Sequence, residues 1–213
     1  YKLIEKRKSE MPSKVQAELT ITKVLVKNLN KKREGIPDEV LTDDWQEILD
    51  DPKISIVIEL MGGIEPARTY ILEALKAGKN VVTANKDLLA EHGKELMDAA
   101  EEYHKDLYFE AAVGGGIPII RPLKECLAGN NITEVMGIVN GTTNYILTKM
   151  TQEGMDFGEA LKQAQELGFA EADPTADVEG LDAGRKMAIL ASIAFHSRVT
   201  FDDVEIKGIS DIT

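Results

Sequence analysis

The sequence has little of what marks secreted, membrane-bound or nucleic-acid-binding proteins. Cysteine occurs once in 213 residues, at Cys126, so no internal disulfide can form, which fits a reducing cytosol. No apolar run approaches the ~20 residues of a membrane span, and no signal peptide is visible. Acidic residues outnumber basic ones by 37 to 25, and the net charge of -12 argues against nucleic-acid or anionic-membrane partners. We therefore expect a cytoplasmic globular protein without such partners.

Several chemical signatures are also absent. His92, His104 and His196 match no metal-ligand spacing, and no HExxH, Cys-His or Ser-His-Asp pattern occurs. The phosphate-binding fingerprint G-x-G-x-x-G is missing, because Ile119 stands where V-G-G-G-I-P-I would need its third glycine. Cys126 falls in an expected helix, so packing is favoured over a nucleophilic role.

The two ends of the sequence have the character of interrupted elements. Tyr1 opens a charged, helix-prone stretch, and the last residues, I-K-G-I-S-D-I-T, are typical of a strand that continues. We therefore expect a piece of a longer protein, with the most diagnostic cofactor loop lying upstream.

The first part of the chain alternates between strand and helix patterns. Residues 54–60, I-S-I-V-I-E-L, form a nearly continuous apolar run that predicts a strand buried on both faces. The alternation predicts an α/β fold with a Rossmann-type parallel sheet, in which ligands sit beyond the carboxyl ends of the strands. The expected strands are 17–26, 54–60, 80–83 and 107–112, and the expected helices are 41–50, 65–77 and 90–104.

Beyond about residue 118 the rhythm changes, so we divide the chain into a partial Rossmann domain at 1–117 and a mixed α/β domain at 118–213. The second domain is expected to contain helices at 119–127, 145–151, 157–167 and 181–195, and strands at 132–139 and 204–209.

An acidic loop that runs into the helix at 181–195 is the strongest candidate site. Asp182 and Lys186 are four residues apart, so they share one helix face, but such pairs are common at surfaces and contribute only ~0.3–0.5 kcal/mol. Taken alone, the pair is better explained as a solvated helix start. Two features favour a site: an apolar neighbourhood at Ile189 and Leu190, and a clustering of carboxylates that calls for a cation.

Two other features lie at the expected ligand edge of the sheet. Lys86, in V-V-T-A-N-K, follows a strand and can reach a phosphate, a carboxylate or a reacting hydroxyl, although spacing alone favours a surface lysine at a helix start. M-G-G at 61–63 and G-G-G at 114–116 are turns, and three successive glycines also expose backbone carbonyls that can ligate a hard cation.

Four longer segments, in order along the chain, resemble homoserine dehydrogenase. They are V-V-T-A-N-K at 81–86, E-A-A-V-G-G-G-I-P-I-I at 110–120, G-I-V-N-G-T-T-N-Y-I-L at 137–147 and G-F-A-E-A-D-P-T-A-D-V-E-G-L-D-A-G-R-K at 168–186. The resemblance implies an NAD(P)-dependent oxidoreductase that interconverts L-homoserine and L-aspartate 4-semialdehyde by hydride transfer. That reaction belongs to the biosynthesis of threonine, methionine and isoleucine.

The resemblance also implies partners and cofactors. These are NADP or NAD, a monovalent cation such as sodium, a small amino-acid substrate, and a second copy bound through the second domain. It places the first strand and its glycine fingerprint before Tyr1, so we expect the chain alone to bind little or no cofactor and to be inactive.

Individual roles follow from the resemblance, position by position. Lys186 matches the acid–base lysine and Asp182 the aspartate beside it. A lysine can bind the homoserine hydroxyl, and a carboxylate can bind its ammonium group. Charged Lys186 can donate a proton during aldehyde reduction. Oxidation needs neutral Lys186 and is therefore favoured at alkaline pH. The implied substrate-binding residues are Glu171, Asp177 and Asp182; the cofactor-binding residues are Met61, Gly62, Lys86 and Gly168; and the cation loop comprises Glu110, Val113, Gly115 and Ile117.

Cofactor choice and two alternatives remain open at this point. The turn after the strand at 17–26 is basic, with Lys27, Lys31, Lys32 and Arg33 and no acid, which leans towards a 2′-phosphate, although a basic surface loop explains it almost as well. One alternative is another amino-acid semialdehyde dehydrogenase; an acylating enzyme of that kind needs a better-placed cysteine than Cys126. The other is a non-catalytic regulatory or binding protein, against which the intact Glu171, Asp182 and Lys186 set argues.

Overall fold

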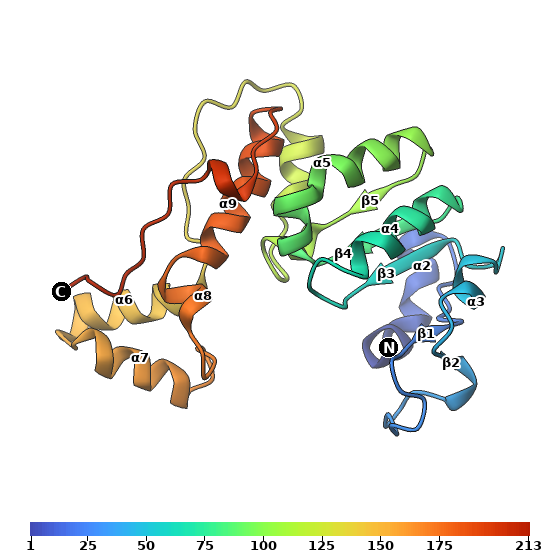
Figure 1. Ribbon diagram of the computed structural model, residues 1–213, viewed down its shortest axis with the longest axis horizontal. Coiled ribbons are helices and arrows are strands. Elements are labelled where there is room, and N and C mark those ends of the chain that lie inside the picture. The colour runs from blue at the N-terminus through green and yellow to red at the C-terminus, as the bar shows by residue number, and fades with distance from the viewer.

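Parallel strands with helical connections confirm the predicted α/β class (Figure 1). The computed structural model describes residues 1–213. Strand β1 (Val24–Leu25) pairs with β2 (Leu41–Thr42), and a second sheet has the order β3 (Ile56–Glu59), β4 (Asn80–Thr83), β5 (Leu107–Tyr108). All pairs are parallel, so the strands of each sheet end at a common edge.

Two helices make the crossovers of the larger sheet. Helix α4 (Ala67–Lys76) connects β3 to β4, and α5 (Lys86–Glu102) connects β4 to β5. Their apolar sides and the strands build the main core, in which Ile71, Leu96 and Phe109 are fully or almost fully buried. Gly78 follows the end of α4 in a left-handed conformation, with φ of 80°.

Helix α5 begins earlier than the predicted start at residue 90. The Asn85 side chain accepts a hydrogen bond from Leu88 N at 3.2 Å, which caps the helix and makes Lys86 its first residue. This shift matters because it moves Lys86 from a loop onto a rigid helix end at the edge of the sheet.

The prediction that residues 54–60 are buried on both faces is wrong. Ile56 and Ile58 are 44% and 48% exposed, whereas the alternate residues Val57 and Glu59 turn towards the core. Strand β3 lies at the edge of its sheet, and α4 packs against only one of its faces. An apolar run therefore identified the strand correctly without revealing which faces are covered.

The second half of the chain is mainly helical. It contains α6 (Gly141–Glu153), α7 (Phe157–Glu166), α8 (Thr175–Val178) and α9 (Leu181–Ala194). Helices α6 and α7 enclose a small separate core around Ile146 and Ala160. Helix α9 packs against α5, and its Ile189 and Leu190 belong to the main core, so α9 joins the two halves (Figure 1).

Two strand predictions in this half are wrong. Residues 132–139 alternate as a strand would, but they pair with no other strand, and Met136 and Ile138 are 85% and 77% exposed. Residues 204–209 form no strand either; they run beside α8, where Ile209 N donates to the Val178 carbonyl at 2.8 Å. Alternation alone does not make a strand, because the backbone also needs a hydrogen-bonding partner.

The remaining expectations differ mainly in their bounds. The strand at 17–26 shortens to β1, and the helix at 41–50 divides into β2 and α3 (Gln46–Leu49). Residues 107–112 become β5 and the 3₁₀ helix η3 (Glu110–Ala112), and 119–127 contains the π-helical turn η4 (Pro122–Cys126). The N-terminal stretch forms α1 (Lys2–Arg7), the 3₁₀ helix η1 (Lys8–Glu10) and α2 (Met11–Val15), and η2 (Asp38–Val40) and η5 (Phe201–Asp203) are further 3₁₀ turns.

No helix combines the length and the apolarity that crossing a bilayer requires.

Candidate functional site

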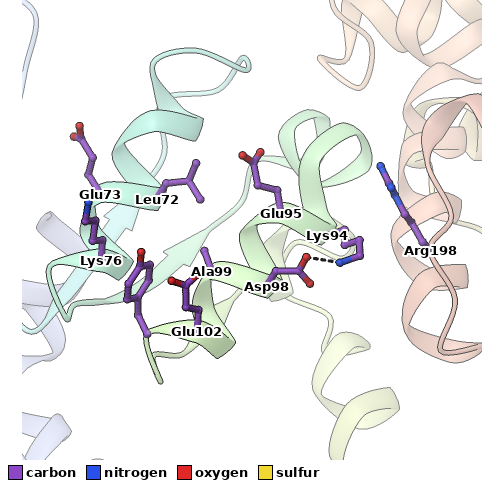
Figure 2. A pocket seen from close by; sticks show the side chains of 10 residues that line it. Leu72, Glu73, Lys76, Lys94, Glu95, Asp98, Ala99, Glu102 and Arg198 are labelled. Carbon is purple, nitrogen blue, oxygen red and sulfur yellow. Dashed lines mark hydrogen bonds and ion pairs between the residues drawn. The ribbon is translucent and has the colours of Figure 1, made fainter.

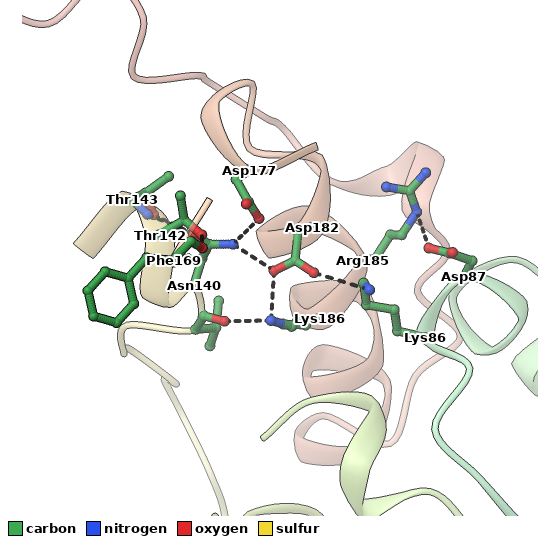
Figure 3. A network of polar contacts seen from close by, with 11 residues as sticks. Lys86, Asp87, Asn140, Thr142, Thr143, Phe169, Asp177, Asp182, Arg185 and Lys186 are labelled. Atoms are coloured by element: carbon green, nitrogen blue, oxygen red, sulfur yellow. Dashed lines mark hydrogen bonds and ion pairs between the residues drawn. The ribbon is translucent and has the colours of Figure 1, made fainter. Parts of the chain in front are cut away.

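A cluster of two lysines and one aspartate forms where α5 meets α9 (Figure 3). Asp182 lies in the first turn of α9 and is only 8% exposed. Its Oδ2 accepts a hydrogen bond from Lys186 Nζ at 2.6 Å, and its Oδ1 lies 3.3 Å from Lys86 Nζ. The structure thus brings together three of the residues that the sequence singled out.

Burial decides between the two explanations of the Asp182–Lys186 pair. The two side chains are 11% and 16% exposed, so the pair is not a solvated surface contact. Lys186 Nζ also donates to the Val139 carbonyl at 2.7 Å, which satisfies a second of its three donors. The pair is therefore a partly desolvated, hydrogen-bonded unit on the inner face of α9.

Lys86 reaches the cluster from the other half of the chain. It is the first residue of α5, directly after β4 and the capping Asn85. A second ion pair joins the same two helices, because Arg185 Nε lies 2.8 Å from Asp87 Oδ1. These two contacts fix the approach of α5 to α9 at the edge of the sheet.

Competing influences act on Asp182. Burial is the largest single influence and raises the pKa of this carboxyl group. The hydrogen bonds from Lys186 and Asn140 and the charges of Lys186 and Lys86 together outweigh burial, so the pKa of Asp182 lies below its ordinary value. Asp182 is therefore an ionised carboxylate at neutral pH.

The sequence did not indicate that Asn140 belongs to this cluster. Asn140 is 7% exposed; its Nδ2 donates to Asp182 Oδ2 at 2.9 Å and to Asp177 Oδ1 at 2.7 Å. Its Oδ1 accepts from Thr143 N at 2.8 Å and caps α6. An asparagine ahead of a helix was the available signal, but only the tertiary fold places it beside α9.

Glu171 and Gly168 lie outside the cluster. The Glu171 side chain is exposed and makes no hydrogen bond or ion pair, and its backbone carbonyl accepts from Gln165 Nε2 at 3.1 Å. Gly168 follows α7 with φ of 77°, a left-handed conformation that favours glycine, so the turn alone accounts for this residue. The other acids of the loop bind locally: Asp173 Oδ1 accepts from Thr175, and Glu179 Oε1 accepts from Ser210 Oγ.

The Met61–Gly63 turn lies at the carboxyl end of β3 and is held by a buried glutamate that the sequence did not single out. Glu59, 4% exposed, accepts from Met61 N at 2.6 Å and Gly62 N at 3.2 Å. Its second oxygen accepts from Thr83 Oγ1 at 2.6 Å, which ties the turn to β4.

Open space surrounds the glycines of this turn. Gly62 and Gly63 have φ of 73° and 70°, and a Cβ on either would meet nothing within 4 Å. Asn85 Nδ2 donates to the Gly63 carbonyl at 2.7 Å and so joins the turn to the start of α5. The turn is therefore open at Gly62 and Gly63 and lies close to the start of α5. The buried Thr83 and Asn85 that support it were also missed from sequence.

The predicted cation loop contains a helix cap. The Glu110 carboxylate accepts hydrogen bonds from the backbone N–H groups of Ile120 at 2.8 Å and Arg121 at 2.9 Å, and from Ile119. Burial raises the pKa of Glu110, but these backbone hydrogen bonds outweigh it and lower the pKa overall. Ile117 N donates to Gly114 O at 3.1 Å, which closes the glycine turn. No cluster of three or more His, Cys, Asp or Glu side chains can hold a metal ion, so a cation here would depend on backbone carbonyls.

A separate hollow of about 630 Å³ lies over α4 and α5 (Figure 2). Its wall carries Glu95, the Lys94–Asp98 ion pair and Arg198 from the segment after α9. None of the predicted site residues lines it. Because its charged side chains largely neutralise one another, we assign the candidate site to the Asp182 cluster instead.

The parallel sheet, its helical crossovers and the polar turns at its carboxyl edge define an α/β protein of the dinucleotide-binding class. Residues 2–110 match the family model "Homoserine dehydrogenase, NAD binding domain", and residues 118–213 match the model "Homoserine dehydrogenase". The chain belongs to the homoserine dehydrogenase family.

Individual relatives agree with this assignment. Homoserine dehydrogenase of Bacillus subtilis (strain 168) is 55% identical over 213 residues, which cover 100% of this chain and 49% of that protein. The crystal structure of a homoserine dehydrogenase from Thiobacillus denitrificans superposes with a TM-score of 0.90 at 44% identity, covering 100% of this chain and 49% of that one. A hyperthermophilic archaeal homoserine dehydrogenase in complex with NADPH gives a TM-score of 0.70 at 35% identity, covering 80% of this chain and 52% of that one. The chain thus spans about half the length of the relatives it matches.

Proposed function

We propose that this protein interconverts L-homoserine and L-aspartate 4-semialdehyde by hydride transfer with a nicotinamide cofactor. The central support is the buried Lys186–Asp182 pair, with Lys86 beside it, at the carboxyl edge of the sheet in a chain of this family. The two named alternatives, a different semialdehyde dehydrogenase and a non-catalytic protein, have no comparable observation in their favour.

Lys186 is the proposed acid–base residue. In aldehyde reduction its ammonium donates a proton to the substrate oxygen, and in oxidation the neutral amine takes the hydroxyl proton. Asp182 orients Lys186 through the 2.6 Å hydrogen bond and neutralises its charge. Lys86 binds the other carboxylate oxygen, so Lys86, Lys186 and Asp182 together carry one net positive charge, which suits a substrate that carries a carboxylate.

The substrate's ammonium group needs a carboxylate that is not already neutralised. Glu171 is exposed and unpaired, and Asp177 is bound by the Asn140 amide rather than by a cation. We assign both to substrate binding with Asp182. Glu171 lies at the outer side of the acidic loop, so its side chain must turn inward when the ammonium is bound.

The carboxyl edge of the sheet fits a nicotinamide dinucleotide. Met61 and Gly62 are assigned to the cofactor because the space around Gly62 is open, Lys86 adjoins this turn, and Gly168 is the further backbone position assigned to the cofactor. When bound, the nicotinamide supplies or accepts the hydride. Arg33 donates to carbonyls of its own loop, which leaves Lys27, Lys31 and Lys32 exposed after β1, and this supports NADP over NAD. The relative solved with NADPH is consistent with that preference.

Four further assignments accompany the activity. A monovalent cation such as sodium is assigned to the backbone carbonyls of Glu110, Val113, Gly115 and Ile117. The domains divide at 1–117 and 118–213, and the second domain forms a homodimer. A single cysteine and the metabolic reaction support a cytoplasmic location.

Turnover tests the proposed function directly. The 213-residue chain, and in parallel the longest gene product that contains it, is mixed with L-homoserine and NADP or NAD, and reduced nicotinamide is followed by absorbance. We expect homoserine-dependent reduction, faster with NADP and at alkaline pH, in the longer form. Turnover and NADPH binding are measured on both forms. Absence of turnover in both forms would contradict the proposed activity.

A further inference from the structure

Two consecutive residues, Val139 and Asn140, bind the two members of the Lys186–Asp182 pair. The Val139 carbonyl accepts from Lys186 Nζ at 2.7 Å, and Asn140 Nδ2 donates to Asp182 Oδ2 at 2.9 Å. Figure 3 shows Asn140 on the side of Asp182 that faces away from Lys86. The segment that leads into α6 therefore holds the cation and the anion of the pair at the same time.

The orientation of the Asn140 amide is determined by its partners. Oδ1 faces Thr143 N at 2.8 Å, and a backbone N–H can only donate, so the oxygen must lie on that side. Nδ2 then faces Asp177 Oδ1 at 2.7 Å and Asp182 Oδ2 at 2.9 Å, and ionised carboxylates can only accept. Both amide hydrogens are used, and the flipped amide would be wrong on both sides.

We propose that Asn140 is a positioning residue of the acid–base cluster, whose amide bridges Asp177 and Asp182 and holds Asp182 between Lys86 and Lys186. This role rests on the proposed function, because it gives Asn140 the task of orienting the acid–base lysine through Asp182. Asn140 is fixed in turn by capping α6, so three helices, α6, α8 and α9, meet at one side chain. Without the bridge, the two carboxylates repel each other and Asp182 is free to follow either lysine.

The charges around Lys186 come from several elements. Asp182 lies on its own helix, Lys86 comes from α5 and Asp177 from α8. The other charged side chains near this part of α9 form no ion pair with Lys186: Asp87 of α5 pairs with Arg185 instead, and Glu91, Lys124, Glu125, Asp202 and Asp203 pair with neither Lys186 nor Asp182. A change at Asn140 therefore alters the nearest charges without disturbing another partner of Lys186.

Asn140→Asp separates positioning from helix capping. Aspartate caps a helix as well as asparagine does, and it has almost the same shape, but it replaces both donors by acceptors. A third carboxylate then stands beside Lys186 and favours its protonated form, so Lys186 should lose its proton about one pH unit higher. In the active form, kcat for homoserine oxidation should fall roughly 10- to 100-fold through misplacement of the pair, with its pH profile moved in the same direction.

The measurement does not depend on activity. Competitive acetylation of the 213-residue chain with acetic anhydride across a pH series, followed by peptide mass spectrometry, gives the titration midpoint of Lys186. Asp156→Asn is the matched control: Asp156 caps α7 through Glu159 N at 3.0 Å, away from the cluster, and its exchange should leave the midpoint unchanged. The double variant Asn140→Asp with Asp177→Asn restores two carboxylates and one amide, so its midpoint should return towards the wild-type value.

The outcomes separate the two proposals. An unchanged Lys186 midpoint in folded Asn140→Asp overturns the positioning role, whether or not homoserine is turned over. If Asn140→Asp does not fold, wild-type kcat in a folded double variant overturns it equally, because the hydrogen bond from residue 140 to Asp182 is still absent there. If the Lys186 midpoint shifts in Asn140→Asp but the wild-type protein does not turn over homoserine, the positioning role is supported and the proposed reaction is contradicted.

Discussion

Lys86 Nζ lies 3.3 Å from Asp182 Oδ1, so the first residue of α5 and the first turn of α9 are joined at a single carboxylate. The other oxygen of that carboxylate binds Lys186 Nζ and Asn140 Nδ2. One buried side chain thus links two helices that pack against each other. Changes at Asp182 should therefore affect stability and activity together.

Asp182→Asn should destabilise the chain at neutral pH. Each charge-assisted hydrogen bond that is lost costs about 1.5–3 kcal/mol, and the substitution leaves both lysines without their counter-ion. Urea unfolding of the 213-residue chain measures the change. Asp106→Asn is the control, because Asp106 is exposed and its side chain makes no hydrogen bond or ion pair.

The same substitution should have a pH-dependent effect of known sign. The pKa of Asp182 is lowered by folding, so its ionised form contributes stability above the unfolded pKa of about 3.9, and this stability is lost as the pH falls through the lower folded value. The difference in free energy of unfolding between wild type and Asp182→Asn should be constant near neutrality and shrink in acid. A difference that grows on acidification would contradict an ionised, lysine-paired Asp182.

Lys186→Arg and Lys186→Met should separate charge from proton transfer. Arginine keeps a positive charge beside Asp182 but does not release a proton at the pH of the assay, and methionine removes the charge. We expect both variants to lose roughly 10²–10⁴-fold in kcat for homoserine oxidation, with only the methionine variant clearly less stable. The assay is nicotinamide absorbance in the active form, with urea unfolding in parallel. Wild-type turnover in Lys186→Arg would remove Lys186 as the base.

Sequence patterns predicted well those elements whose ends are marked by residues close by in the sequence. The bounds of β4 coincide with the predicted 80–83, and α9 begins at the predicted Leu181. The shared face of Asp182 and Lys186 also follows from helical periodicity alone. What periodicity does not contain is the depth of burial, and only the 11% and 16% exposure separates this pair from a surface pair.

Long-range partners account for what the sequence did not reveal. Asn140 and Asp182 are 42 residues apart, and neither the turn pattern N-G-T-T-N nor the acidic loop indicates that they meet. Glu59 looked like one polar residue in an apolar strand, yet its carboxylate holds the Met61–Gly62 turn and Thr83. The strand predicted at 132–139 is absent for a related reason. A strand needs a second strand to pair with, and one segment of sequence does not show whether that partner exists.

Glu110→Gln should distinguish a helix cap from a cation ligand. The Glu110 carboxylate binds three backbone N–H groups, whereas cation binding through this loop would use the backbone carbonyl, which the substitution retains. We expect a loss of about 1 kcal/mol in free energy of unfolding. Because the pKa of Glu110 is lowered in the folded chain, this loss should appear near neutral pH and diminish in acid.

The cation half of this test uses activity in the active form. The dependence of turnover on sodium concentration should be the same in Glu110→Gln and wild type, because the backbone carbonyls are unchanged. A large increase in the sodium concentration required would show that the carboxylate itself takes part, contrary to the assignment to carbonyls.

Gly180→Ala should destabilise the start of α9 more than an ordinary glycine substitution does. Gly180 has φ of 80°, and a Cβ there would lie 3.0 Å from Ile206 Cγ2 and 3.3 Å from the Lys207 carbonyl oxygen. Gly154 has φ of 66° with nothing within 4 Å, so Gly154→Ala measures the left-handed strain alone, about 1–2 kcal/mol. Gly180→Ala should exceed it by about 1 kcal/mol or more, because the Lys207 backbone cannot move as freely as a side-chain end. Urea unfolding of both variants measures the two losses in free energy of unfolding. Equal losses would mean that residues 206–207 move aside easily and do not hold the first turn of α9, which carries Asp182, in place.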